Sequence, residues 1–154
     1  MKAILQRVNS AAVTVDDVIT GSCNFGLMIL LGVMNGDSEK EADALVKKIA
    51  NLRIFRDENG RLNKSLLDVK GEVLIISNFT LSANYTHGNR PDYMSAAAPD
   101  EANRLYEYFC EAFHKMVEYR TVGRGVFGAH MRINADLCGP VTIVMDSEKL
   151  KKEK

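Results

Sequence analysis

A nearly uninterrupted apolar run at residues 26–34 (GLMILLGVM) constrains the fold of this chain more than any other feature. A glycine opens the run, and the pair Asn35-Gly36 follows it. An apolar run of this length between turn residues is typical of a β-strand that is covered on both of its faces. The run therefore predicts a central strand of a sheet.

Three β segments are expected before this run. Residues 2–8 and 11–15 are rich in apolar and β-branched residues, and they meet at Asn9-Ser10. Residues 18–20 continue the β-branched pattern up to Gly21. Together these segments predict a meander.

Further strands are expected later in the chain. Residues 52–55 predict a strand, and the turn residues 57–60 after it predict a hairpin-like loop. Residues 72–81 (EVLIISNFTL) predict a second apolar strand that ends in polar side chains. Residues 129–136 and 141–146 predict the two final strands.

Two helices are predicted from their first turns and their apolar spacing. Ser38 and Glu41 match the capping box, so a helix begins there. A second helix begins at Pro99, with acidic residues in its first turn. Apolar side chains recur at helical spacing in both: Ala42, Leu45, Val46, Ile49 and Ala50 in the first, and Leu105, Tyr106, Phe109, Phe113, Met116 and Val117 in the second.

The length and charge of the chain limit the kinds of partner it can have. Its 154 residues fit one domain, predicted over residues 1–147, with a charged tail at 148–154. Twenty Lys and Arg balance twenty Asp and Glu, so no global positive field draws in long stretches of nucleic acid. We therefore expect no DNA partner, and any RNA contact must be local. Lys64, Arg90 and the tail lysines are open candidates for phosphate contacts.

The cysteines and the N-terminal segment favour a cytoplasmic protein. Cys23, Cys110 and Cys138 are far apart and odd in number, which argues against a disulfide framework. The N-terminal segment has no apolar core or cleavage site of a secretory signal. No run reaches the ~18 apolar residues that a membrane helix needs. We expect no membrane association.

Two motifs suggest sites that their context does not support. Residues 123–128 match the glycine pattern of a dinucleotide site, but that pattern needs a strand before it and a helix after it. Here the order is reversed, so a glycine-rich turn is the better interpretation. His87, His114 and His130 have no partner at metal-ligand spacing. No metal and no cofactor are predicted.

The first candidate site is the end of the predicted strand at Ser77-Asn78-Phe79-Thr80, where two hydroxyls, an amide and an aromatic ring follow an apolar run. Functional residues often collect at such ends. The structural alternative is that these hydroxyls only cap backbone groups. A serine or threonine nucleophile also needs an activating base, and no histidine with an orienting acid lies nearby in sequence.

The second candidate is Gly139-Pro140, which separates the two final strands. Proline breaks a strand ladder and is compatible with a cis bond or a sharp turn. A rigid turn of this kind holds backbone carbonyls and amides in fixed directions. Such a clamp could sort mirror-image substrates.

Six sequence blocks, in order, resemble the D-aminoacyl-tRNA deacylase family over essentially the whole chain. They are MKAILQRV with AAVTV, GLMILLGV, LRIFRDENG, SNFTL at 77–81, GNRPDY at 88–93 and GPVTI at 139–143. The resemblance implies an α/β (α+β) fold with mixed, largely antiparallel sheets, a barrel-like core and two main helices. It also implies a metal-free cytoplasmic homodimer that hydrolyses the ester between tRNA and a D-amino acid or glycine, as chiral proofreading in translation.

The resemblance assigns roles to the candidate residues. Ser77, Phe79 and Thr80 would line the pocket for the terminal adenosine and the ester, and their backbone amides are candidates for an oxyanion hole. Gly139 and Pro140 would form a cis-proline clamp that enters the partner subunit's pocket and rejects L-amino acids. The other residues expected to bind substrate are Asn78, Phe127, Met131, Val141 and Thr142.

The attacking group and two departures from the family pattern leave alternatives open. With no visible base for Thr80, we expect a water to attack with help from the terminal 2′-hydroxyl of the tRNA. Asn78 stands where the family usually has Gln, and Leu137-Cys138 stand where it usually has Asn and a small polar or acidic residue. A module that binds the tRNA end without turnover is therefore an alternative. A general esterase or amidase that uses Thr80 is a third.

Overall fold

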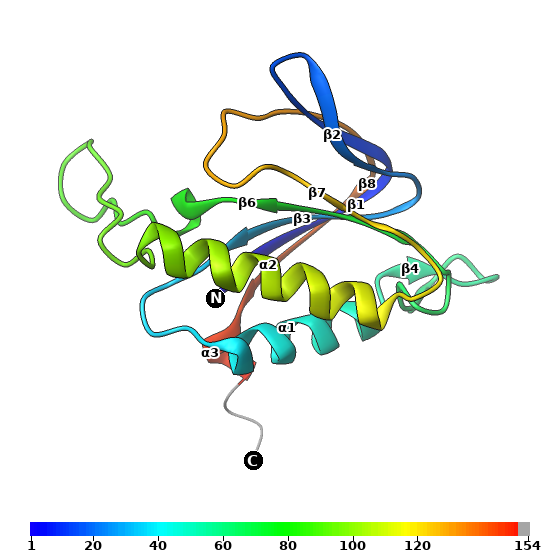
Figure 1. The fold of residues 1–154 in the computed structure, drawn as a ribbon. Coiled ribbons are helices and arrows are strands. Elements are labelled where there is room, and N and C mark those ends of the chain that lie inside the picture. Colours follow the sequence, from blue (N-terminus) through cyan, green and yellow to red (C-terminus); the bar gives the residue numbers. More distant parts are fainter. Residues whose placement is uncertain (151–154) are drawn as a thin grey trace.

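A mixed six-stranded sheet, with its helices gathered on one face, makes up most of the computed structural model (Figure 1). The structure describes residues 1–150, so the last four residues of the predicted tail lie outside it. The strands and helices are β1 (Lys2–Val15), β2 (Val18–Cys23), β3 (Gly26–Gly32), α1 (Glu39–Asn51), β4 (Phe55–Arg56), β5 (Leu62–Lys64), β6 (Glu72–Ser77), the 3₁₀ helix η1 (Phe79–Ser82), α2 (Pro99–Met116), β7 (Val122–Arg124), β8 (Arg132–Asp146) and α3 (Ser147–Leu150).

Strand β3 lies at the centre of the sheet, as its apolar run predicted. The order is β2-β1-β3-β6-β7, and β8 pairs with the other edge of β1. β3 pairs antiparallel with β1 and parallel with β6, and six of its seven residues are buried. The connection from β3 to β6 contains α1, and the one from β6 to β7 contains α2. Both parallel pairs therefore have a helical crossover, as parallel strands require.

Two glycines allow the sheet to curl into a nearly closed barrel. A Cβ on Gly21 of β2 would lie 2.2 Å from the carbonyl oxygen of Arg124, and one on Gly123 of β7 would lie 2.4 Å from that of Ser22. Only glycine permits this approach of the β2 and β7 backbones. Gly123 was predicted to lie in a turn, which is wrong. The turn of this motif starts later, at Phe127.

The strand β1 combines two predicted segments. Residues 2–8 pair with β3 and residues 11–15 pair with β2, while β8 runs along the opposite edge of both halves. The predicted break at Asn9-Ser10 is where β1 changes partner, and it also lies at an irregularity of the β8 register. The chain therefore passes from one neighbour to the next without leaving the sheet.

The two predicted final strands are also one strand, β8, which begins at Arg132 rather than at residue 129. Leu137 pairs with Val8 and Thr142 pairs with Gln6. Residues 138–141 are therefore opposite Arg7 alone, and they form a bulged loop within β8. Proline interrupts the pairing, as expected, but the strand resumes in the same direction.

Two other predicted strands are shorter than expected. The strand β6 ends at Ser77, because Phe79–Ser82 turns into η1. In the predicted strand 52–55, Leu52 instead caps α1, and its backbone N–H donates to the carbonyl of Ile49. Only Phe55–Arg56 pairs, with β5, across the predicted hairpin turn.

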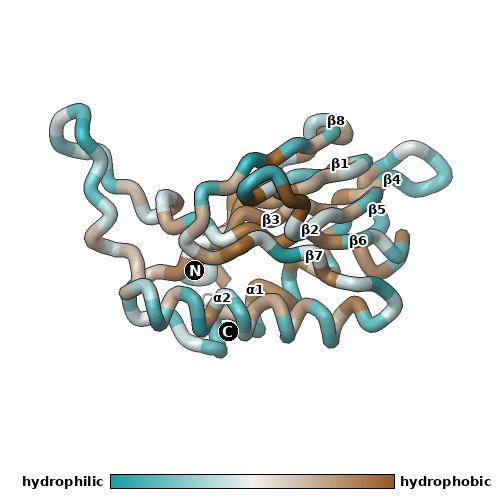
Figure 2. Tube along the Cα trace, turned by 45° about the horizontal axis from the view of Figure 1, so that its top comes forward, coloured by the Kyte–Doolittle hydropathy of each residue, from teal (hydrophilic) through white to brown (hydrophobic). Residues whose placement is uncertain are grey.

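The helices begin where the sequence predicted and cover one face of the sheet. The backbone N–H of Ser38 donates to the carboxylate of Glu41 at 2.8 Å, which completes the capping box of α1. The apolar stripes of α1 and α2 pack with β1, β3 and β6 in the main core, with Met116 only partly buried. A smaller core, including Val13, Met28 and Leu74, fills the inside of the barrel. Figure 2 shows hydrophobic residues concentrated in the central strands.

Candidate active site

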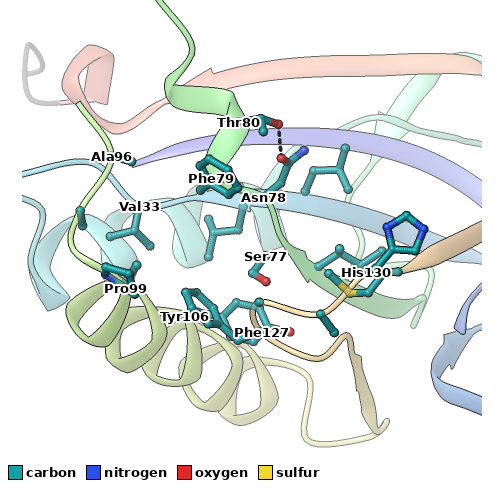
Figure 3. Close-up of a pocket in the computed structure, with 18 of the residues that line it drawn as sticks. Val33, Ser77, Asn78, Phe79, Thr80, Ala96, Pro99, Tyr106, Phe127 and His130 are labelled. Carbon is teal, nitrogen blue, oxygen red and sulfur yellow. Dashed lines mark hydrogen bonds between the residues drawn. The ribbon is translucent and has the colours of Figure 1, made fainter. Parts of the chain in front are cut away.

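A cavity of about 590 Å³ opens where β6 ends, between η1, the start of α2 and the turn before β8 (Figure 3). None of the described residues that line it is Asp, Glu, Lys or Arg. The lining residues are Leu30, Leu31, Val33, Ile76, Ser77, Asn78, Phe79, Thr80, Ala96, Ala97, Pro99, Ala102, Tyr106, Phe127, Gly128, Ala129, His130, Met131 and Ile133. A cavity whose described lining has aromatic rings and no Lys or Arg side chain suits a flat neutral group such as a nucleobase better than a phosphate.

The cavity brings together six of the residues singled out from the sequence: Ser77, Asn78, Phe79, Thr80, Phe127 and Met131. Phe127 and Met131 lie about fifty residues after the others in sequence, and the strand order places them opposite the end of β6. The predicted residues Gly139, Pro140, Val141 and Thr142 do not line this cavity.

Thr80 is held by an amide rather than activated by a base. Its hydroxyl donates to the side-chain oxygen of Asn78 at 2.5 Å (Figure 3). An amide oxygen does not take the hydroxyl proton at neutral pH, so this contact orients Thr80 without making it a nucleophile. The side chain of Asn78 therefore stabilises the local turn by accepting this hydrogen bond.

The floor of the cavity is built by Tyr106 and Phe127, whose ring centroids are 6.2 Å apart. The hydroxyl of Tyr106 donates to the carbonyl of Ile75 at 2.8 Å. Burial raises the pKa of Tyr106, so this hydroxyl stays protonated. The sequence predicted Tyr106 only as a core residue. A further role was indicated by its hydroxyl, a polar group within the apolar stripe of the helix, because a buried tyrosine hydroxyl usually has a hydrogen-bond partner.

At the mouth of the cavity an aromatic pair faces solvent. The ring of Phe79 is 58% exposed and meets the ring of Tyr93 edge-on, with centroids 5.2 Å apart. His130 lies across the cavity from Pro99 (Figure 3). The contribution of His130 was not predicted, because a lone histidine in a loop has no spacing signal.

The Gly139-Pro140 loop is exposed, and side-chain hydrogen bonds from β1 hold it in place. The peptide bond between these residues is cis, and Gly139 has φ +133°, a conformation that favours glycine. The guanidinium of Arg7 donates from Nε to the carbonyl of Cys138 at 3.1 Å and from Nη1 to the carbonyl of Ile54 at 2.9 Å. Thr142 donates to the side chain of Gln6 at 2.8 Å. Arg7 thus holds the loop despite the altered residues before it.

Sequence reasoning missed Arg7, although a signal was present. Ala3 and Leu5 point into the core from alternate positions of β1, and Arg7 is the next position on that face, with 3% exposure. A cation on the buried face of a strand needs fixed hydrogen-bond acceptors. Its acceptors are backbone carbonyls far away in sequence.

None of the three cysteines lines the cavity. All three cysteines are free. Burial raises the pKa of the Cys23 thiol to about 11 and that of Cys110 to about 12, so neither is a ready nucleophile. Within residues 1–150, no three His, Cys, Asp or Glu side chains gather into a possible metal site. None of the described helices could cross a membrane.

Comparisons with known proteins agree on one family. The family model described as D-Tyr-tRNA(Tyr) deacylase matches residues 4–146. A D-aminoacyl-tRNA deacylase of Thermosipho melanesiensis is 49% identical over 150 residues, which covers 97% of this chain and 99% of the relative. The corresponding protein of Persephonella marina is 47% identical and covers 97% and 100%.

Two solved structures share the fold. One, described as c-Myc DNA Unwinding Element Binding Protein, superposes with a TM-score of 0.89 at 38% identity and covers 95% of this chain and 98% of the other. The second, described as a probable eukaryotic D-amino acid tRNA deacylase, has a TM-score of 0.82 at 17% identity and covers 94% and 97%. The predicted mixed sheet, barrel-like core and two main helices are confirmed.

Proposed function

Because this chain belongs to the D-aminoacyl-tRNA deacylase family, we propose that its cavity takes the 3′-terminal adenosine of a D-aminoacyl-tRNA and hydrolyses the ester at that end. The observation that carries the proposal is the aromatic cavity of about 590 Å³ at Ser77-Asn78-Phe79-Thr80, whose described lining has no Asp, Glu, Lys or Arg. A nucleoside fits such a space, while the phosphates stay outside it. The enzyme is a hydrolase, and we expect it to need no metal or cofactor.

The bound substrate lies with its adenine against the rings of the cavity and its ester beside Ser77 and Thr80. The backbone amides of Phe79 and Thr80 begin η1, and the first amides of a helix have no acceptor within it. These amides stabilise the negative charge that develops on the ester oxygen. The side chains of Asn78 and Thr80 keep the turn in place.

In the proposed reaction, a water oxygen forms a bond to the ester carbonyl, and the bond from that carbon to the ribose 3′ oxygen breaks. The neighbouring 2′-hydroxyl helps to move the water proton to the 3′ oxygen. The products are the free D-amino acid and the tRNA. DNA lacks the 2′-hydroxyl. We therefore keep RNA as the partner, even though one structural relative is described as binding a DNA element.

Chiral selection requires a second copy of the chain. The Gly139-Pro140 loop is exposed and lies off its own cavity, so it is free to enter the cavity of a partner. Exposed apolar side chains on the same strand, Ile133, Leu137 and Val144, support a homodimer through this face. The loop carbonyls hold the α-amino group, so that an L side chain collides with the backbone while a D side chain or glycine fits.

The first test is deacylation of D-tyrosyl-tRNA and L-tyrosyl-tRNA by the purified protein with a chelator present. We expect release from the D form only, and a much slower release from D-tyrosyl-tRNA that ends in 2′-deoxyadenosine. No release from either ester, with tRNA still bound, would favour the binding module without turnover. Release from both would contradict the clamp but not the hydrolase.

The third alternative, a general esterase, is tested with small esters that carry no RNA. Thr80→Val is the matched variant, since it replaces the hydroxyl with a methyl group of similar size. Hydrolysis of such esters that disappears in this variant would support the esterase. Hydrolysis of D-tyrosyl-tRNA that persists in this variant would support attack by water.

A further inference from the structure

A solvent-exposed arm, residues 84–94, projects from the chain between η1 and α2. It leaves the body of the molecule at the end of the sheet where the cavity opens (Figures 1 and 2). Every residue of the arm is exposed, so the arm contributes nothing to the core. Exposed aromatic and apolar side chains at one place on a surface often mark a binding site.

The neck of the arm is held by hydrogen bonds. Asn84 and Asp92 exchange two backbone hydrogen bonds, each of 2.9 Å. Asn35 donates from its side chain to the carbonyl of Met94 and from its backbone to that of Ser95, again at 2.9 Å. The position of the arm relative to the cavity is therefore defined.

The side chains of the arm combine rings with positive charge. Tyr85 is 76% exposed, and Tyr93 extends the aromatic surface of Phe79 outward from the cavity mouth. Arg90 adds a cation at the far part of the arm. Asp92, the one acidic residue of the arm, lies at its neck, where its carboxylate accepts from the backbone N–H of Met94 at 3.1 Å. Exposed rings with an adjacent arginine are the features that proteins use to bind single-stranded nucleic acid.

We propose that this arm binds the single-stranded nucleotides that precede the terminal adenosine of the tRNA. This inference rests on the proposed function, because a nucleoside in the cavity leaves its own phosphate and the preceding nucleotides at the mouth. Tyr85 stacks on a base, and Arg90 contacts a phosphate. Because the chain has no net charge, its electrostatic attraction for RNA must come from such local contacts.

Arg90 fits this role better than Lys64, the other candidate in the body of the chain. Lys64 forms an ion pair with Glu58 on the β4–β5 hairpin. That hairpin lies at the end of the molecule opposite to the arm (Figure 1). A phosphate beside the cavity mouth therefore cannot reach Lys64.

The test compares two substrates in Tyr85→Ala, Tyr85→Phe and Arg90→Ala. D-tyrosyl-tRNA has the preceding nucleotides, and D-tyrosyl-adenosine lacks them. We expect Tyr85→Ala to raise KM for the tRNA about tenfold, as loss of one base stack does, with KM for the adenosine ester unchanged. Tyr85→Phe keeps the ring and should behave as the unchanged protein does. Arg90→Ala should weaken the salt dependence of KM by about one phosphate contact.

The matched control is Arg61→Ala, an exposed arginine on the β4–β5 hairpin. It should leave both KM values unchanged. The proposal is wrong if the arm variants alter both substrates equally, if they leave KM for the tRNA unchanged, or if they act by separating a dimer, as light scattering would show.

Binding of a short RNA that ends in CCA separates failure of this inference from failure of the proposed function. If the unchanged protein hydrolyses neither substrate, but Tyr85→Ala still weakens its binding of this RNA, the arm proposal stands and the hydrolase proposal fails. If hydrolysis occurs and RNA binding is equal in both proteins, the arm proposal fails.

Discussion

Replacement of Arg7 by methionine should release the Gly139-Pro140 loop and reduce chiral selection. Methionine keeps an unbranched chain on the buried face of β1 but removes Nε and Nη1, the two guanidinium nitrogens that donate to backbone carbonyls. The carbonyls of Ile54 and Cys138, at 2.9 and 3.1 Å, would lose their partner. Residues 138–141 have no other strand neighbour, because Arg7 alone is opposite them in the ladder.

The cost in stability follows from two opposing effects. Two hydrogen bonds from a charged donor contribute about 3 to 6 kcal/mol together, and removal of a buried cation returns part of this, so the net loss is about 2 kcal/mol. Among residues 1–150, no carboxylate forms a salt bridge with Arg7, so none would be left unpaired. For a chain of this size the melting temperature should fall by about 4 to 8 °C.

The assay is the ratio of kcat/KM for D-tyrosyl-tRNA to that for L-tyrosyl-tRNA. Displacement of a positioning group by about 1 Å can change rates a hundredfold, so we expect the ratio to fall at least about tenfold in Arg7→Met. Ile49→Ala, in the main core, is a control because it should destabilise by about 2 to 5 kcal/mol without removing a hydrogen bond to the loop. An unchanged ratio in Arg7→Met, or an equal fall in Ile49→Ala, would refute the reasoning.

Three other predictions concern single residues. Gly139→Ala places a Cβ 2.8 Å from the backbone nitrogen of Val141 at a positive φ, so it should cost about 1 to 3 kcal/mol in urea denaturation and should also raise hydrolysis of L-tyrosyl-tRNA. Thr80→Ala should keep substantial kcat on D-tyrosyl-tRNA, because its hydroxyl is bound to Asn78 and not to a base; loss of turnover with intact tRNA binding would restore Thr80 as nucleophile. Burial raises the pKa of Cys110 from 9.0 to about 12, so the stabilising contribution of the protonated thiol is complete below pH 9 and is lost as pH rises toward 12. Cys110→Ala should therefore weaken the fall in the free energy of unfolding between pH 8 and pH 10. An identical fall in both proteins would contradict this.

The sequence predicted best those features that are decided by neighbours along the chain. The capping box at Ser38 and Glu41 is complete within four residues, and it correctly marked the start of α1. The apolar run of β3 reports burial on both faces and so gave its central position. The end of β6 was less certain, because propensity does not distinguish a last strand residue from the first turn of η1.

Strands that depend on partners distant in sequence were either not predicted or predicted as two separate strands. The short strand β7 exists because it pairs with β6, about fifty residues earlier, and its Gly123 packs against the backbone of Ser22, about a hundred residues earlier. β1 was divided at Asn9-Ser10 because a change of partner resembles a turn in sequence. Ser77, Phe79 and Thr80 are neighbours in sequence, so they could be proposed as a site from their own segment. Arg7 is distant in sequence from the Gly139-Pro140 loop, so its hydrogen bond to that loop could not be predicted.

The pairing of β1 with β8 has a consequence for biosynthesis. Lys2 is opposite Asp146 and Thr14 is opposite Arg132, so one edge of β1 stays open until the end of β8 has been synthesised. At a translation rate of about 5 to 20 residues per second, this takes on the order of ten seconds. An unpaired strand edge invites association with other chains for as long as it is exposed. The nascent protein is therefore most vulnerable to aggregation before its C-terminal strand leaves the ribosome, when a chaperone that covers β1 would help it most.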